Sequence, residues 1–162
     1  MSRKLDIKSM IFERKKVLDF FSIVYPNTFE VMPEEDAQLK YHSSLRPEVI
    51  LTTSDHTVNL GFSLFQNPQI KSTRETIESI REAFENKQAP RIFRIGDATP
   101  LQRVKGSWFD FRTYAGDTVI YNMHLIAIIN GVALQSSFNC PFDDFADWRA
   151  ITIQMWESIK HE

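Results

Sequence analysis

The sequence has few of the residues on which the commonest ligand and redox sites are built. Its 162 residues include 5 glycines and a single cysteine, Cys140. Walker-type and dinucleotide-type phosphate loops need closely spaced glycines, and neither pattern occurs, so nucleotide binding by those routes is excluded. One cysteine excludes an internal disulfide and a multi-cysteine metal site, and it suits a reducing compartment.

Long apolar runs and a strong net charge are also missing. No stretch approaches the roughly 20 apolar residues that a membrane-spanning helix needs. The short run 10–12 is followed at once by four charged residues, which excludes a signal-peptide core. The formal net charge is −2, whereas a dedicated nucleic-acid binder usually carries a basic surface. We therefore expect a cytoplasmic protein that spans no membrane and does not have nucleic acid as its main partner.

The remaining composition is that of one ordinary globular domain. Hydrophobic residues make up 43% of the chain and charged residues 25%, which is typical of a folded domain of this length. The basic segment 1–16 is expected to be a lead-in or a short edge strand. No linker interrupts the rest, so residues 17–162 are expected to form a single domain.

Alternating and helical patterns predict the elements of this domain. The predicted strands cover 18–25, 48–53, 57–65, 91–95, 101–105, 108–114, 119–129 and 132–139. The predicted helices cover 33–41, 72–86 and 141–160. Asn130-Gly131 separates two apolar runs and is a strong signal for a hairpin with a type I′ turn, because both residues tolerate positive φ.

The predicted fold class is α+β, with a mostly antiparallel sheet of about six or seven strands sandwiched by helices. The strand 119–129 carries apolar residues on both of its faces towards its end. A strand of this kind is covered on both sides of its sheet. The helices 72–86 and 141–160 each have an apolar stripe suited to that role.

Candidate catalytic residues are isolated in the sequence. His124 lies within a predicted strand and is interpreted as a neutral core residue with a hydrogen-bond partner. Cys140 precedes the last helix and is interpreted as buried. Ser54-Asp55-His56 contains the residue types of a hydrolytic triad, but consecutive residues cannot aim their side chains at one another, so a turn is predicted. We predict no catalytic centre, no metal site and no cofactor.

One strand face has the composition of a binding surface. In 108–114, alternate positions place four side chains on one face: Trp108, Asp110, Arg112 and Tyr114. Aromatic residues and arginine are enriched at the centres of protein interfaces, and they also stack on single-stranded bases. These four residues are the predicted partner-binding site, and the partner is expected to be another protein.

The order of elements resembles the PsbP-like fold family, over about residues 17–160. The residues that carry the resemblance are the first strand Phe20-Phe21-Ser22-Ile23-Val24-Tyr25-Pro26, the helix 72–86, the meander through Trp108, Tyr121 and Asn130-Gly131, the exit Phe138-Asn139-Cys140-Pro141, and Trp148 with Ser158-Ile159 in the last helix. This family includes a photosystem II extrinsic subunit, a nuclear Ran-binding factor and chaperones of type VI secretion effectors. The resemblance implies a non-enzymatic adaptor or chaperone-like role.

Three functions follow from these observations. The first is a cytoplasmic protein-binding domain of adaptor or chaperone type. The second is a small-ligand-binding protein or hydrolytic enzyme with a pocket between sheet and helix, using His124 or Cys140. The third is single-stranded nucleic-acid binding through Trp108, Arg112 and Tyr114.

Overall fold

The computed structural model describes residues 7–41, 46–65, 70, 72–86 and 91–162 of the chain. The helices within these residues are α1 (Glu34–Lys40), α2 (Thr73–Asn86) and α3 (Phe145–Glu157), with 3-10 turns η1 (Ile7–Ser9) and η2 (Phe142–Asp144). The strands are β1 (Phe12–Val17), β2 (Phe21–Pro26), β3 (Glu30–Val31), β4 (Val49–Thr52), β5 (Asn59–Leu64), β6 (Ile92–Phe93), β7 (Thr99–Pro100), β8 (Gly106–Ala115), β9 (Thr118–Ile129), β10 (Val132–Pro141) and β11 (Lys160–His161).

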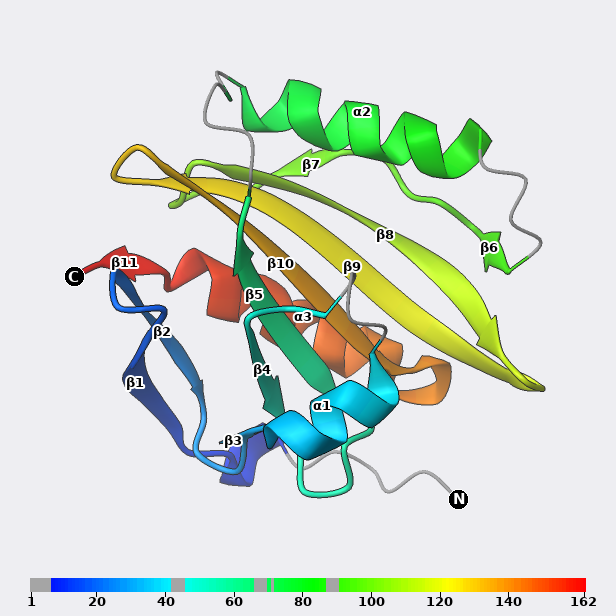
Figure 1. The fold of residues 1–162 in the computed structure, drawn as a ribbon, viewed down its shortest axis with the longest axis horizontal. Helices are drawn as coiled ribbons and strands as arrows, with labels where there is room; N and C mark the ends of the chain where they lie inside the picture. Colours follow the sequence, from blue (N-terminus) through cyan, green and yellow to red (C-terminus); the bar gives the residue numbers. More distant parts are fainter. Residues whose placement is uncertain (1–6, 42–45, 66–69, 71, 87–90) are drawn as a thin grey trace.

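Two antiparallel sheets make up the framework of the molecule. The main sheet runs β3-β4-β5-β10-β9-β8-β6, with β7 also paired to β8, and the small sheet runs β1-β2-β11. The long strands β8, β9 and β10 form the predicted meander through the middle of the main sheet (Figure 1). The turn between β9 and β10 has φ values of 49° at Asn130 and 80° at Gly131. Two positive φ values are what a type I′ turn requires, so the hairpin prediction is confirmed.

Helices cover both faces of the main sheet, as the sandwich prediction required. Figure 1 shows α2 lying along one face and α3 behind the other. Leu125 and Met123 of β9 belong to the large core that contains Trp148 and Met155 of α3. Ile126, on the opposite face of the same strand, packs with Phe109 and with Ile77 of α2. We call the face of the main sheet that packs on α3 the α3 face, and the opposite one the α2 face. The prediction that β9 is buried on both sides is confirmed.

Each helix packs apolar side chains against the main sheet, and α2 also begins at a capping side chain. The Ser72 hydroxyl accepts a hydrogen bond from the Glu75 backbone N–H (3.2 Å), which satisfies one of the free donors at the start of α2. Trp148, Ile151 and Met155 of α3 are buried against the main sheet. The helix α1 packs Ala37 against Ile50 of β4. Because Ile50 pairs with Gly61, and Gly61 with Ser137, α1 lies on the α2 face.

The structure differs from the predicted elements in several places. Leu18 and Asp19 have positive φ in the turn between β1 and β2, so the strand predicted from residue 18 begins at Phe21, and the last helix begins at Phe145, after η2. The main sheet has eight strands rather than six or seven. Three of them, β3, β6 and β7, are only two residues long, which makes their number hard to predict. The strand expected at 101–105 is absent, and β7 pairs with β8 just before it. The last helix ends at Glu157, after which β11 pairs with β2. Elements of two residues carry no alternation, so no sequence pattern distinguishes them from loops.

Candidate functional site

The four predicted partner-binding residues lie on the α3 face of β8, but they differ in exposure. Trp108 is 3% exposed and belongs to the main core. Its ring lies 6.4 Å from that of Trp156, and the Arg149 guanidinium lies 5.0 Å above it. Because the indole is enclosed, it is not available to stack on a nucleic-acid base or to insert into a partner.

Asp110 is the centre of a polar cluster next to Trp108. Its carboxylate accepts a hydrogen bond from the Tyr121 hydroxyl (2.6 Å) and lies 3.6 Å from the Arg149 guanidinium. Burial, followed by the hydrogen bond and charge of Asp110, raises the pKa of Tyr121 well above its ordinary value. Tyr121 therefore stays protonated as a donor, and Asp110 is held in place by one neutral and one positive partner.

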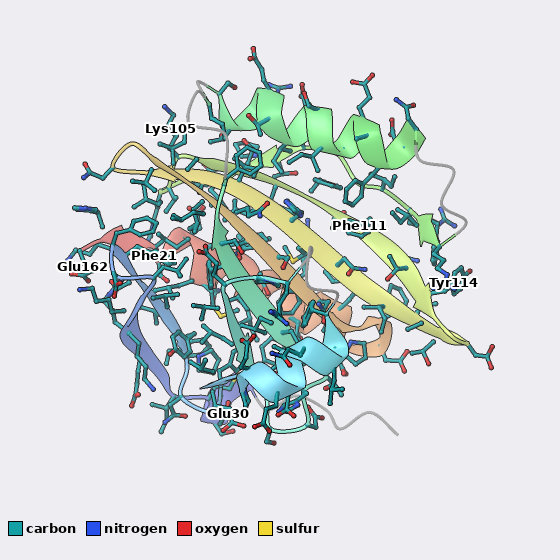
Figure 2. All side chains as sticks on the ribbon, viewed as in Figure 1. Phe21, Glu30, Lys105, Phe111, Tyr114 and Glu162 are labelled. Atoms are coloured by element: carbon teal, nitrogen blue, oxygen red, sulfur yellow. The ribbon has the colours of Figure 1, made fainter. Side chains whose placement is uncertain are left out.

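Arg112 and Tyr114 continue the same face towards the free end of β8. The Arg112 guanidinium lies 4.2 Å from the centre of the Phe142 ring, a cation–π contact. Tyr114 is 48% exposed and stacks on Phe93 of the paired strand β6 at 4.6 Å. Figure 2 shows Tyr114 at the far end of the sheet, away from α2.

These contacts lie side by side along the α3 face of β8, on a partly exposed surface that we call the β8 strip. It consists of Phe93, Asp110, Arg112, Tyr114, Phe142 and Arg149. Three of the four predicted residues belong to it, and Trp108 supports it from below. Phe93, Phe142 and Arg149 were missed by sequence reasoning because they come from β6, η2 and α3, which reach β8 only in the folded chain.

His124 and Cys140 lie on opposite faces of the main sheet. Cys140 is fully buried in the core of the α3 face, as predicted. Burial, with a smaller contribution from Asp144, raises the pKa of its thiol to about 12, so the thiol stays protonated at neutral pH. His124 is on the α2 face, where it pairs with Phe109 and Ser137. The sheet separates the two groups, and they cannot act on one substrate.

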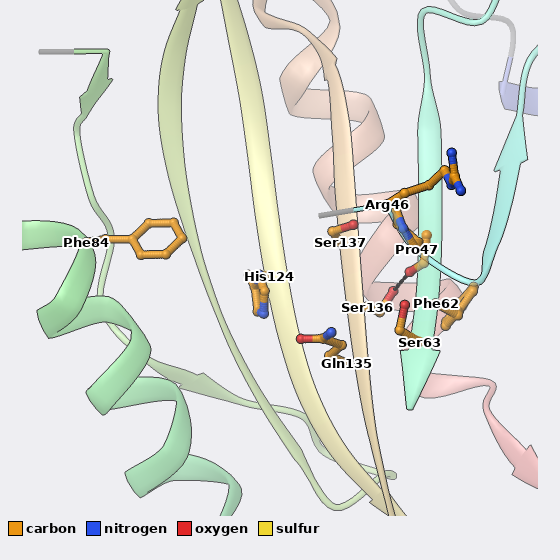
Figure 3. Close-up of a pocket in the computed structure, with 10 residues that line it drawn as sticks. Arg46, Pro47, Phe62, Ser63, Phe84, His124, Gln135, Ser136 and Ser137 are labelled. Atoms are coloured by element: carbon orange, nitrogen blue, oxygen red, sulfur yellow. Dashed lines mark hydrogen bonds between the residues drawn. The ribbon is translucent and has the colours of Figure 1, made fainter. Parts of the chain in front are cut away.

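The α2 face has a cavity between α2 and the segment that precedes β4. It has a volume of about 310 Å³ and is lined by Arg46, Pro47, Gly61, Phe62, Ser63, Phe84, His124, Gln135, Ser136 and Ser137. Figure 3 shows that α2 supplies one wall through Phe84, while the segment before β4 supplies the other through Pro47. The floor is a row of cross-strand partners in which His124 pairs with Ser137 and Ser137 with Gly61.

The prediction that His124 is neutral agrees with the structure, but the prediction that it has a hydrogen-bond partner is wrong. Burial lowers the pKa of His124 to about 4, and its ring stacks near that of Phe109 at 6.1 Å. Its Nε2 atom is buried and has no hydrogen-bond partner among the described residues. The residues paired with His124 on the neighbouring strands are Phe109 and Ser137. Phe109 has no polar side-chain atom, and the Ser137 hydroxyl makes no hydrogen bond to Nε2.

Gly61 allows the cavity wall to approach the sheet. A Cβ atom at this position would lie 2.5 Å from Pro47 Cγ, closer than packed atoms tolerate, and would make a tight contact of 3.1 Å with Ser137 Oγ. The glycine in the middle of β5 is therefore explained by the close passage of the segment that precedes β4.

A Gly61→Ala variant is expected to lose about 1–3 kcal/mol of unfolding free energy, because the added methyl group must displace the Pro47 ring. Urea unfolding of the two proteins measures this loss. A Gly131→Ala variant is the control for backbone strain alone, since Gly131 has positive φ and nothing within 4 Å of its added Cβ. A shift of the His124 and Ser137 amide signals in Gly61→Ala alone would identify the contact as the cause; unchanged stability would contradict it.

Two further properties concern sites that the described residues lack. Within 7–41, 46–65, 70, 72–86 and 91–162, no group of three or more histidine, cysteine or acidic side chains is placed to hold a metal ion. No helix in the same residues is long and apolar enough to cross a bilayer. The residues Ser54-Asp55-His56 form the predicted turn between β4 and β5, in which the Asp55 carboxylate accepts the Thr57 backbone N–H (3.1 Å).

Comparison with known proteins identifies the fold. No protein-family model matches the sequence, and no curated protein matches it. The solution structure of cyanobacterial PsbP (CyanoP) from Synechocystis sp. PCC 6803 matches with a TM-score of 0.62 and 11% identity, over 100% of this chain and 99% of that one. The Ran-binding protein Mog1p of Saccharomyces cerevisiae matches with a TM-score of 0.59 and 9% identity, over 93% and 95%.

A third similar structure is LpqN, a protein involved in cell envelope biogenesis of Mycobacterium tuberculosis. It matches with a TM-score of 0.56 and 11% identity, over 87% of this chain and 82% of that one. The chain therefore has the PsbP/Mog1-like fold over nearly its whole length, and the resemblance predicted from the order of elements is confirmed. At identities of 9–11%, the likeness establishes the fold and not a function.

Proposed function

We propose that this chain is a non-enzymatic protein-binding domain of adaptor or chaperone type, and that the β8 strip is its contact surface. The observation that carries the proposal is the continuous series of arginine and aromatic side chains on the α3 face of β8. Arg112 lies on Phe142, Tyr114 lies on Phe93, and Arg149 pairs with Asp110 beside them on the same strand face. Tyrosine and arginine dominate the energetic centres of protein interfaces.

The geometry of the strip favours a protein over a nucleic acid. Phe93 and Tyr114 stack on each other, and Phe142 lies under Arg112. Each ring therefore already has one face covered, whereas a nucleic-acid base stacks on an uncovered ring. Trp108, which the nucleic-acid hypothesis requires, is buried. The formal net charge of −2 also gives little general attraction to phosphates.

Two further observations agree with a binding role. Mog1p, one of the proteins that share this fold, is a Ran-binding protein. In this chain the sheet separates His124 from the protonated thiol of Cys140, so the two side chains do not form a nucleophile–base pair. The buried free thiol suits the reducing, cytoplasmic compartment that we propose for this domain.

Affinity capture with the tagged chain tests the proposal. We expect wild-type protein to retain at least one protein from an extract of its own cells, and an Arg112→Ala/Tyr114→Ala variant to retain about tenfold less of it, because both side chains would lie at the centre of the contact. Quantitative mass spectrometry of the retained proteins measures the ratio.

The matched control is Leu39→Ala. Leu39 lies on α1, on the other face of the main sheet, and is 89% exposed. This variant is expected to retain the same protein as the wild type. Circular dichroism must show that all three proteins are folded. Equal retention by the wild type and the double variant, or no retained protein at all, would contradict the proposal.

A further inference from the structure

The cavity between α2 and the segment that precedes β4 is separate from the β8 strip. Its floor lies on the α2 face, whereas the strip lies on the α3 face of the same sheet. Its volume of about 310 Å³ is at the lower end of the ~300–1,000 Å³ of small-molecule pockets. A molecule bound there would contact none of the residues proposed to bind a protein, so the two sites can be tested separately.

Three neighbouring side chains on the cavity floor have unused hydrogen-bonding capacity. His124 pairs across the sheet with Ser137, and Gln135 lies two residues along the same strand β10. Within the described part of the chain, no hydrogen bond reaches the side chain of any of the three. Figure 3 shows all three side chains projecting from β9 and β10 into the space between Phe84 and Pro47.

The next row of the same sheet face is, by contrast, fully connected. Asn59 Nδ2 donates to Asn139 Oδ1 (3.0 Å), and Asn139 Nδ2 donates to the Tyr41 hydroxyl (3.3 Å). Thr52 Oγ1 donates to Asn59 Oδ1 (2.7 Å). Polar side chains on this face therefore find partners where α1 covers them. On this face of the sheet, the unpartnered side chains of the described residues named above all line the cavity, which is the arrangement of a binding site.

The unpartnered nitrogen of His124 is the most informative of these groups. Buried polar atoms in folded proteins almost always have a hydrogen-bond partner, and a buried atom without one lowers stability. A leucine at this position would fill similar space without that cost. Thr152 Oγ1 is a second buried atom without a partner among the described residues, but only His124 also lines the cavity. Its buried Nε2 atom becomes available to a group that arrives from the cavity once the imidazole rotates.

The lining selects an uncharged ligand. Burial keeps the His124 imidazole neutral at pH 7 by lowering its pKa to about 4, and serine and glutamine are neutral at any pH of interest. Arg46, the charged residue among the described lining residues, already pairs with Glu34 at 3.1 Å. A charged ligand would lose its hydration without gaining an unpaired countercharge.

Phe84, the α2 residue in the cavity lining, favours a ligand with a flat apolar face. Phe84 is held edge-to-face by Phe109 (5.5 Å) and Phe111 (5.1 Å), and Figure 3 shows its ring directed from α2 towards the floor of the cavity. A ring that is already fixed loses little conformational freedom when a ligand packs against it. The cavity thus combines one aromatic wall with a neutral hydrogen-bonding floor.

We propose that this cavity binds a small uncharged ring compound that carries several hydrogen-bonding groups. His124, Gln135 and Ser137 hydrogen-bond the edge of the ring, and Phe84 packs against its face. Neutral sugars and nucleosides share this chemistry, since both combine a ring with donors and acceptors on its edge. The two sources are distinguished by experiment.

Titration of the ¹⁵N-labelled full chain with two sets of probes tests the proposal. One set is glucose, galactose and N-acetylglucosamine, and the other is adenosine and uridine, each at up to millimolar concentration. We expect saturable shifts of backbone amide signals in β9 and β10 around His124 and Gln135 with members of one set. The set that binds identifies the source.

Variants connect the binding to the proposed residues. His124→Leu and Ser137→Ala are each expected to weaken the bound probe about tenfold or more, through loss of a hydrogen bond to it. Leu39→Ala is the control and is expected to bind as the wild type does. If His124→Leu does not fold, Ser137→Ala carries the comparison. No saturable shift with either set, shifts confined to other parts of the chain, or undiminished binding by Ser137→Ala would each overturn the proposal.

Discussion

A Trp108→Ala variant is expected to lose about 3–5 kcal/mol of unfolding free energy. Trp108 is 3% exposed within the core that joins β8 to α3, with Trp156 at 6.4 Å and the Arg149 guanidinium at 5.0 Å. Removing the indole leaves a cavity between two elements that cannot close together without moving the main sheet. Single domains have a total stability of roughly 5–15 kcal/mol, so the variant loses a large part of it.

Urea unfolding followed by tryptophan fluorescence and circular dichroism measures this loss. Tyr114→Ala is the control from the same strand face, and it is expected to cost no more than about 1.5 kcal/mol, the value of an aromatic pair such as its stack on Phe93. Trp108→Ala with the stability of the control would show that the indole is not part of the core. Because Trp108→Ala disturbs the fold, it is also unsuitable as a binding variant, and Arg112 and Tyr114 take its place.

The second large effect is the pH dependence contributed by His124. Burial lowers the pKa of His124 from 6.5 to about 4, so between these values the unfolded chain binds a proton that the folded chain does not. The wild type therefore loses stability as the pH falls below 6.5. The loss reaches about 3 kcal/mol at pH 4, since one pKa unit corresponds to ~1.4 kcal/mol. Above pH 6.5 the imidazole is neutral in both states, and the loss disappears.

The unfolding free energies of the wild type and His124→Leu are compared across this pH range. Both proteins contain the same carboxylates, so the difference between their pH dependences comes from His124. At pH 7 the variant is expected to be at least as stable as the wild type, because it removes a buried nitrogen that has no partner among the described residues. At pH 4 it is expected to be more stable than the wild type by about 3 kcal/mol beyond any difference at pH 7. Parallel stability curves for the two proteins from pH 7 to pH 4 would contradict the burial of a neutral imidazole.

The sequence patterns predicted the long elements of the fold because each carried a complete local signal. The alternation in 119–129, the helical stripe in 72–86 and the Asn130-Gly131 turn are all present in the structure. The second sheet could not be predicted in the same way. Its edge strand β1 is FERKKV, whose charged residues are exposed on both sides, and its strand β11 has two residues. Both form because β2 offers free backbone groups for pairing.

The candidate sites were predicted less completely, for a different physical reason. The alternation in 108–114 correctly places Asp110, Arg112 and Tyr114 on one face. It cannot show that α3 covers the start of this face and buries Trp108, while the end remains open. The cavity depends on the pairing of His124 with Ser137 and of Ser137 with Gly61. The predicted Asn130-Gly131 hairpin already sets the first of these pairs. Gly61 is distant in the sequence, however, and nothing local shows that α2 and the segment before β4 leave a gap above these residues.

The dissociation constant of the captured partner, measured by isothermal titration calorimetry with the purified chain, is the most direct test of the proposed function. The Arg112→Ala/Tyr114→Ala variant is expected to bind at least about tenfold more weakly than the wild type, a loss of ~1.4 kcal/mol or more. Leu39→Ala is expected to bind with the wild-type constant. A double variant that is folded and binds as tightly as the wild type would show that the β8 strip is not the contact surface.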